Sequence, residues 1–262
     1  MKLIADNIQI TNRRIEKALA EMDPYPIQEL AVKCEKAGAQ ALDINSGPLL
    51  RDPDKKMLFL VEAVQEVSDL PVLLDTANPR AIGAGLLANR KKAVINGFSM
   101  EPVKLESILP LAKRFEADII GYLIYPDSHV PSDSSERLNI AVDLYQECQK
   151  RGIDKEQLII DPVILPMTWQ SGNLQNMEIL SVISRLPELL GFNVRTIAAI
   201  SNLTTGQGPK EKKLLLERTY LSMLAASGLS MVMLNMFHSE TIQTANACRQ
   251  FLEPKVFSWE EM

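Results

Sequence analysis

Short runs of apolar residues recur along the whole chain, and each is followed by a longer segment with apolar residues at helical spacing. The runs are mostly apolar on both faces, which is typical of strands in a parallel sheet that is covered on two sides. We predict eight strands, at residues 3–8, 40–45, 72–76, 93–98, 118–124, 158–165, 196–203 and 231–237.

The segments between these strands carry helix signals. Asp52-Pro53 and Asn78-Pro79 each place a capping residue before a proline in a first turn. Further amphipathic helices are predicted over residues 103–115, 135–151, 175–190, 211–226 and 240–252. Strand-helix units repeating in this way, with no low-complexity linker, predict an α/β protein of one domain, a (β/α)8 TIM barrel over residues 1–262.

A doubly wound open sheet is the alternative fold. Such a sheet normally carries a glycine-rich phosphate loop after its first strand. Residues 7–14 contain no glycine, which favours the barrel.

Polar side chains stand at the carboxyl ends of nearly all the predicted strands, where a barrel of this kind carries its chemistry. They are Asp6, Gln9, Asp43, Asn45, Asp75, Asn78, Asn96, Tyr122, Asp127, Asp161, Asn202 and Asn235. For any single one, a structural hydrogen bond is an equal alternative. As a set, they predict a ring of donors and acceptors that suits a planar, nitrogen-rich ligand.

The net charge of the chain, and the lack of Lys, Arg and His in the predicted strands, exclude several classes of function. With 28 Lys and Arg against 33 Asp and Glu, the formal charge of −5 excludes a basic nucleic-acid reader and gives no reason to expect binding to an anionic membrane. No Lys, Arg or His lies inside a predicted strand or at its immediate end. Schiff-base chemistry, a phosphate clamp and a His-ligated metal therefore lack candidates, which disfavours a lyase or hydrolase. We expect no metal bound by this chain.

The remaining reactive and basic residues are interpreted as structural. Cys34, Cys148 and Cys248 fall in predicted helices, away from the barrel mouth, and His129 and His238 fall in loops or at a helix start. Met231, Met233 and Met236 suit barrel packing. The basic run 210–213 with Arg218 is interpreted as a solvated helix start. The alternative is contact with the polyglutamate tail of a bound ligand. Neither an export signal nor a membrane span is indicated, so a cytoplasmic setting is expected.

Five strand-end strings carry a resemblance to a known family. They are residues 42–48 (LDINSGP), 74–78 (LDTAN), 94–96 (VIN), 160–166 (IDPVILP) and 200–203 (ISNL). In order and spacing the chain resembles the methyltetrahydrofolate:corrinoid protein methyltransferases, pterin-binding barrels that are related to the folate domain of cobalamin-dependent methionine synthase.

This resemblance implies a role for each matching position. Asp75, Asn96 and Asp161 would hold the pterin ring, and Asn202, a mobile asparagine in the family, would bond at N5 and act in catalysis. Asp6, Asp43, Asn45 and Asn235 would support the site or stand at its rim.

The resemblance also implies the reaction and the partners. A methyl group would move between N5 of tetrahydrofolate or methyltetrahydrofolate and the cobalt of a corrinoid (cobalamin) carried by a separate protein, and the enzyme would be a homodimer. A non-catalytic pterin-binding barrel and a dihydropteroate synthase-like enzyme are the alternatives. The synthases look less similar, because they use basic residues near the last strands.

The chain departs from close relatives in this family at three places. These are the first strand around Asp6, the position of Asn235, where an aspartate is common, and the longer loop 204–213.

Overall fold

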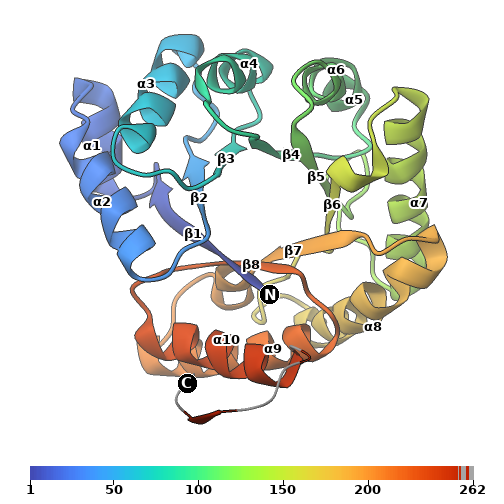
Figure 1. The fold of residues 1–262 in the computed structure, drawn as a ribbon. Helices are drawn as coiled ribbons and strands as arrows, with labels where there is room; N and C mark the ends of the chain where they lie inside the picture. Colours follow the sequence, from blue (N-terminus) through green and yellow to red (C-terminus); the bar gives the residue numbers. More distant parts are fainter. Residues whose placement is uncertain (253, 255–257, 260–262) are drawn as a thin grey trace.

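Eight parallel strands close into a barrel in the computed structural model, which describes residues 1–252, 254 and 258–259. Each strand pairs with the next along the chain, and β1 pairs with β8 (Figure 1). The strands are β1 (Lys2–Gln9), β2 (Ala41–Asn45), β3 (Val72–Asp75), β4 (Val94–Phe98), β5 (Asp118–Tyr122), β6 (Leu158–Asp161), β7 (Arg195–Ala199) and β8 (Met231–Leu234). The closed barrel confirms the predicted fold and rules out the open sheet.

Helices surround the barrel on its outer side (Figure 1). They are α1 (Arg13–Glu21), α2 (Tyr25–Lys36), α3 (Pro53–Gln65), α4 (Pro79–Ala88), α5 (Pro102–Ser107), α6 (Leu109–Arg114), α7 (Ser134–Lys150), α8 (Gly172–Leu190), α9 (Lys210–Ala226) and α10 (Ser239–Leu252), with 3₁₀ helices η1 (Lys155–Gln157) and η2 (Ile200–Thr204). In the described part of the chain, no helix is both long enough and apolar enough to cross a membrane.

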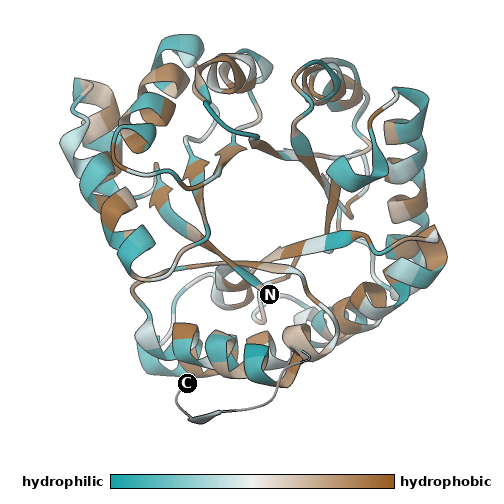
Figure 2. Ribbon diagram, in the orientation of Figure 1, coloured by the Kyte–Doolittle hydropathy of each residue, from teal (hydrophilic) through white to brown (hydrophobic). Residues whose placement is uncertain are grey.

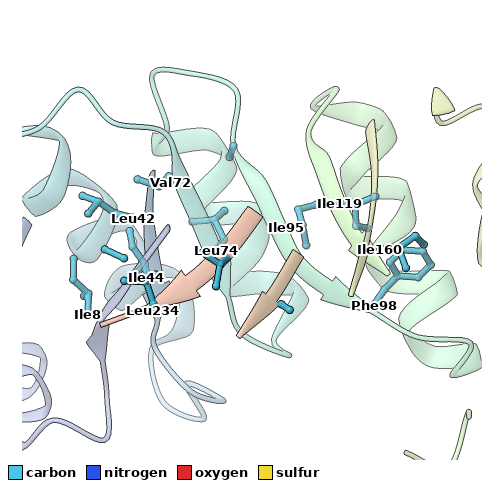
Figure 3. Packing of buried hydrophobic residues seen from close by; sticks show 14 of the residues in the cluster. Ile8, Leu42, Ile44, Val72, Leu74, Ile95, Phe98, Ile119, Ile160 and Leu234 are labelled. Atoms are coloured by element: carbon cyan, nitrogen blue, oxygen red, sulfur yellow. The ribbon is translucent and has the colours of Figure 1, made fainter. Parts of the chain in front are cut away.

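The main core lies between the strands and the helices. Side chains such as Ile44, Leu74, Ile119 and Ile160 are fully buried there, and Figure 3 shows them directed away from the strands. Figure 2 shows that apolar residues concentrate on the strands, whereas the helices alternate between apolar and polar positions. This cover by helices explains why the strand sequences are largely apolar.

A second apolar cluster fills the inside of the barrel. It consists of Ile4, Ala41, Leu73, Ile120, Ile159, Ile197, Met231 and Met233. Because side chains alternate between the two faces of a strand, the residue two places further along also faces inward. Those residues are polar on five strands: Asp6, Asp43, Asp75, Tyr122 and Asp161. The inside of the barrel is therefore an apolar floor beneath a polar layer. On the strands that carry the polar layer, apolar character on both faces holds only for the first part of the strand.

Several strands end earlier than predicted. β6 ends at Asp161 because the Val163 N–H turns back to donate to the Asp161 carboxylate at 2.8 Å, with Val163 at φ 62°. β7 ends at Ala199 because the chain enters η2, a 3₁₀ helix that the predicted strand 196–203 had included. β5 and β8 are also shorter, ending at Tyr122 and Leu234. β5 and β6 therefore end at a polar residue, whereas β7 and β8 end at an apolar one.

Two helix predictions need correction, and one is confirmed. The predicted helix 103–115 is split at Ile108 into α5 and α6, and Pro110 lies in the first turn of α6. The Asp52 side chain makes no capping hydrogen bond. Asn78 does cap α4, since its side chain accepts from the Arg80 and Ala81 N–H groups.

Basic residues do occur in two strands, at positions just before the predicted starts. Lys2 and Arg195 are the first residues of β1 and β7. Both lie at the amino end of the barrel, where Arg195 binds Asp118 at 2.7 Å. They stand at the opposite end from the polar layer.

Gly97→Ala should destabilise the barrel beside Asn96. A Cβ atom at Gly97 would lie 2.4 Å from the Ile120 carbonyl oxygen, and backbone on a neighbouring strand cannot easily move away. We expect a loss of about 1–3 kcal/mol in the free energy of unfolding, seen as a Tm lower by several degrees in a thermal melt. In the matched control Gly83→Ala, within α4, the new Cβ meets only Leu111 at 3.9 Å, so Tm should be unchanged or higher.

Candidate functional site

A chain of hydrogen bonds links three strands within the polar layer. The Asn96 amide donates to Asp43 at 3.1 Å, and the Tyr122 hydroxyl donates to the Asn96 side-chain oxygen at 2.7 Å. Asp43 is only 1% exposed, and its pKa is raised well above the ordinary value by burial and then by the nearby Asp75 carboxylate. The network fixes the orientation of the Asn96 amide.

Asp75 belongs to a second, adjoining pair. The Asn45 amide donates to Asp75 at 2.5 Å, and the Gly47 N–H donates to the Asn45 oxygen at 3.2 Å. Burial raises the pKa of Asp75 to about 6, although the Asn45 hydrogen bond opposes the shift. Asn45 therefore orients the Asp75 carboxylate rather than standing apart at the rim.

Asp161 closes the layer from β6. Burial raises its pKa to about 7, against the opposing effects of the Val163 hydrogen bond and the charge of Arg137. One carboxylate oxygen is taken by the Val163 N–H. No other described residue donates a hydrogen bond to this carboxylate, so its second oxygen is available to a ligand.

Tyr122 lies among the three carboxylates. Its pKa is raised well above the ordinary value by burial and then by Asp75, Asp161 and Asp43, in that order. Strand register places Tyr122 opposite Asp161, and Asp75 opposite Asn96. The structure thus brings together the predicted pterin-binding residues Asp75, Asn96 and Asp161, together with Tyr122, for which the sequence suggested no role beyond the ring.

The sequence reading missed Arg137, which is fully buried in α7 behind Asp161. It donates to the carbonyl of Pro162, next to Asp161, and burial lowers its pKa to about 10. Its position continues the buried stripe formed by Ala141, Leu144 and Cys148. A charged residue in the apolar stripe of a helix was the signal that could have found it.

Asn202 stands apart from this network. It is exposed on η2, and no described residue forms a hydrogen bond with its side chain. Its backbone carbonyl accepts from the Thr205 N–H at 3.2 Å. The Asn202 side chain is therefore free to turn toward a ligand.

Two other residues of the predicted ring, Asn235 and Asp127, have structural partners. Asn235 accepts from the Asn7 amide at 2.8 Å and from the Phe237 N–H at 2.9 Å, so it fastens the end of β8 to β1. Asp127 is exposed in a loop, where it pairs with His129. These contacts favour the structural reading for both residues.

A cavity of about 400 Å³ opens beside the polar layer, at the ends of β1 and β8. Its lining includes Asp6, Ser201, Glu217, His238 and Thr241, but no Lys or Arg among the described residues. Burial raises the pKa of Asp6 to about 6, and the nearby Glu217 charge adds to the shift. This part of the mouth is acidic.

The remaining basic and cysteine predictions fit the structure. Lys210 begins α9, where Lys213 donates to the Gly206 carbonyl and Arg218 pairs with Glu240, contacts that suit a helix start. The cysteines lie in α2, α7 and α10, as predicted.

Asp161→Asn should change stability in a pH-dependent way. The folded-state pKa of Asp161, about 7, lies above its ordinary value of 3.8, so ionisation of this carboxyl weakens the folded state as pH rises from about 4 to 7. Asn keeps an oxygen for the Val163 N–H but cannot ionise. We expect the variant to be more stable than the wild type at pH 8, by about 2 kcal/mol, and nearly equal at pH 4.5.

Chemical denaturation at the two pH values measures this difference. The control is Asp143→Asn, at an exposed position in α7. It should leave the free energy of unfolding unchanged at both pH values. An equal effect of Asp161→Asn at both pH values would contradict a raised pKa at Asp161.

Known proteins share sequence, fold or both with this chain. It is 21% identical over 195 residues to the methylcorrinoid:tetrahydrofolate methyltransferase of Eubacterium limosum, covering 73% of this chain and 70% of that one. The fold is similar to a Yersinia pestis dihydropteroate synthase (TM-score 0.69, 18% identity, 95% of this chain and 92% of that one) and to the Xanthomonas albilineans enzyme (0.68, 19%, 94% and 91%). The model of the pterin binding enzyme family matches residues 11–235, and the chain therefore belongs to that family.

Proposed function

We propose that the protein is a methyltransferase that moves a methyl group between N5 of tetrahydrofolate and the cobalt of a corrinoid held by a separate protein. The observation that carries this proposal is the desolvated set of Asp75, Asn96 and Asp161 at the carboxyl ends of β3, β4 and β6, together with an exposed Asn202 in η2, directly after β7. The Asn202 side chain is not engaged by any described residue. The similarity to the Eubacterium limosum enzyme supports the choice of reaction.

The acceptors in the polar layer match the donors of a pterin. A carboxylate can accept from the exocyclic amino group and the adjacent ring N–H as a charge-assisted pair. The second oxygen of Asp161 is available for such a contact, and Asn96, held by Asp43 and Tyr122, offers a fixed amide. The buried setting strengthens each of these bonds.

The proposed chemistry is an in-line displacement in which the corrinoid supplies the cobalt that accepts or donates the methyl group. A tertiary amine is a poor leaving group, so departure of N5 requires a proton. The Asn202 amide can bond to the protonated nitrogen, but it is no practical acid, and the proton comes from solvent. Asp75, Asn96 and Asp161 hold the ring so that N5 faces the open mouth.

The similar fold of the dihydropteroate synthases makes that activity the second candidate. Basic residues near the last strands are expected for such an enzyme. The cavity at the ends of β1 and β8 instead carries Asp6 and Glu217, and no described Lys or Arg lines it. This acidic lining favours the methyltransferase.

Asp161→Asn should weaken binding of methyltetrahydrofolate while the barrel stays folded. A charge-assisted hydrogen bond contributes about 1.5–3 kcal/mol, so we expect Kd to rise by about ten- to a hundredfold in isothermal titration calorimetry. Asp143→Asn should bind like the wild type. Unchanged affinity of Asp161→Asn would remove Asp161 from the site.

Asn202→Ala should slow methyl transfer without loss of stability. Because Asn202 is exposed and its side chain forms no hydrogen bond with a described residue, Tm should stay within a degree or so of the wild type. Loss of a group that bonds to N5 in the transition state should lower the rate by about a hundredfold. The assay follows the absorbance change when tetrahydrofolate demethylates methylcobalamin.

The control for this variant is Asn193→Ala, an exposed asparagine just before β7 at the other end of the barrel. It should exchange methyl at the wild-type rate. A wild-type rate for Asn202→Ala would end the proposed role at N5. Folate binding without any methyl exchange by the wild type would instead indicate a non-catalytic pterin-binding barrel.

A further inference from the structure

The segment that carries Asn202 is held on one side by apolar contacts. In η2, Ile200 and Leu203 are buried in the main core, and the Leu203 carbonyl accepts from the Met167 N–H at 2.9 Å. The preceding Ala199 provides no side-chain cap for η2. These contacts fix the inner side of η2 and leave its polar side to other partners.

Two acidic side chains bind that polar side, one on either side of Asn202. The Ser201 hydroxyl donates to the Asp6 carboxylate at 3.3 Å. The Thr204 hydroxyl donates to the Glu217 carboxylate. Asp6 comes from β1 and Glu217 from α9, so η2 is tied to two elements that are distant in the sequence.

The pair of acids is unfavourable for folding on its own. Asp6 and Glu217 are 6% and 7% exposed and close enough to repel each other, and no described Lys or Arg lines the cavity that they share. Buried like charges without a cation weaken the folded state. The hydroxyl donors of Ser201 and Thr204 are the hydrogen bonds that offset this cost.

We propose that Asp6 and Glu217 are positioning residues that hold η2 and so set where Asn202 meets N5 of the pterin. This inference rests on the proposed methyl transfer and adds two residues that do not touch the ring. The pterin itself is held by Asp75, Asn96 and Asp161, on other strands. Loss of the two hydroxyl-carboxylate bonds should therefore affect the transfer step rather than folate binding.

Thr204→Val tests the bond to Glu217, because it removes the hydroxyl and keeps the shape of the side chain. We expect kcat for methyl exchange to fall by about ten- to a hundredfold, the effect of a small misplacement of a catalytic group. Kd for methyltetrahydrofolate, measured by calorimetry, should stay within about twofold, since the ring contacts are intact. Thr204→Ser keeps the hydroxyl and should retain most of the wild-type rate.

Ser201→Ala and Asp6→Ala make the same test at the other end of η2, in case Thr204→Val fails to fold. Both should lower kcat with little change in folate affinity. Asp6→Asn keeps an acceptor oxygen and removes the repulsion with Glu217, so it should recover most of the rate with an equal or higher Tm. A merely structural role would predict that rate, affinity and Tm fall together.

The outcomes separate this inference from the proposed function. If Asn202→Ala loses methyl exchange while Thr204→Val, Ser201→Ala and Asp6→Ala keep the wild-type kcat, positioning by the two acids is wrong and the proposed function stands. If the wild type shows no methyl exchange with methylcobalamin, both fail. Parallel loss of folate affinity and kcat in the three variants would also overturn the inference, because it would assign Asp6 and Thr204 to general stability.

Discussion

Desolvation of the carboxylates in the upper layer of the barrel is the constraint on which the site depends. Closure of the sheet turns every second side chain inward, and above the apolar floor those side chains include Asp43, Asp75 and Asp161. Burial raises the pKa of each. The hydrogen bonds that offset this cost come from the Asn96 amide to Asp43, the Asn45 amide to Asp75 and the Val163 N–H to Asp161. Such a layer is poised to take a ligand that brings more N–H donors.

Residues inside the barrel and in the helix layer both stabilise this polar layer. Asn45 and Tyr122 orient groups within the barrel. Arg137 acts from the helix layer, where it donates to the Pro162 carbonyl and its charge opposes the rise in the pKa of Asp161. Stability and binding are therefore in partial conflict here. Replacing Asp161 by a neutral amide should favour folding and weaken the site, which is the usual sign of a group retained for function.

The sequence predicted the barrel and the strand-end residues well, because strand periodicity and parallel topology together determine which side chains reach the mouth. It predicted poorly where side chains from distant elements decide the outcome. The local pattern could mark Arg137 as a buried residue, but it could not place Arg137 behind Asp161. It also did not show that the predicted strand 196–203 turns into η2. The link from Ser201 to Asp6 spans 195 positions, and only the closed barrel brings β1 beside the last strands.

The apolar floor has a consequence for the order of events. Ile4, Leu73, Ile120 and the other side chains of that cluster fill the lower part of the barrel, so a molecule bound on the polar layer can enter and leave only through the mouth. In the proposed reaction, the corrinoid protein must approach from the same side. A folate seated beneath that protein is then enclosed between partner and floor, and its release must wait until the partner withdraws. The two substrates should therefore obey an ordered sequence, folate first on and last off.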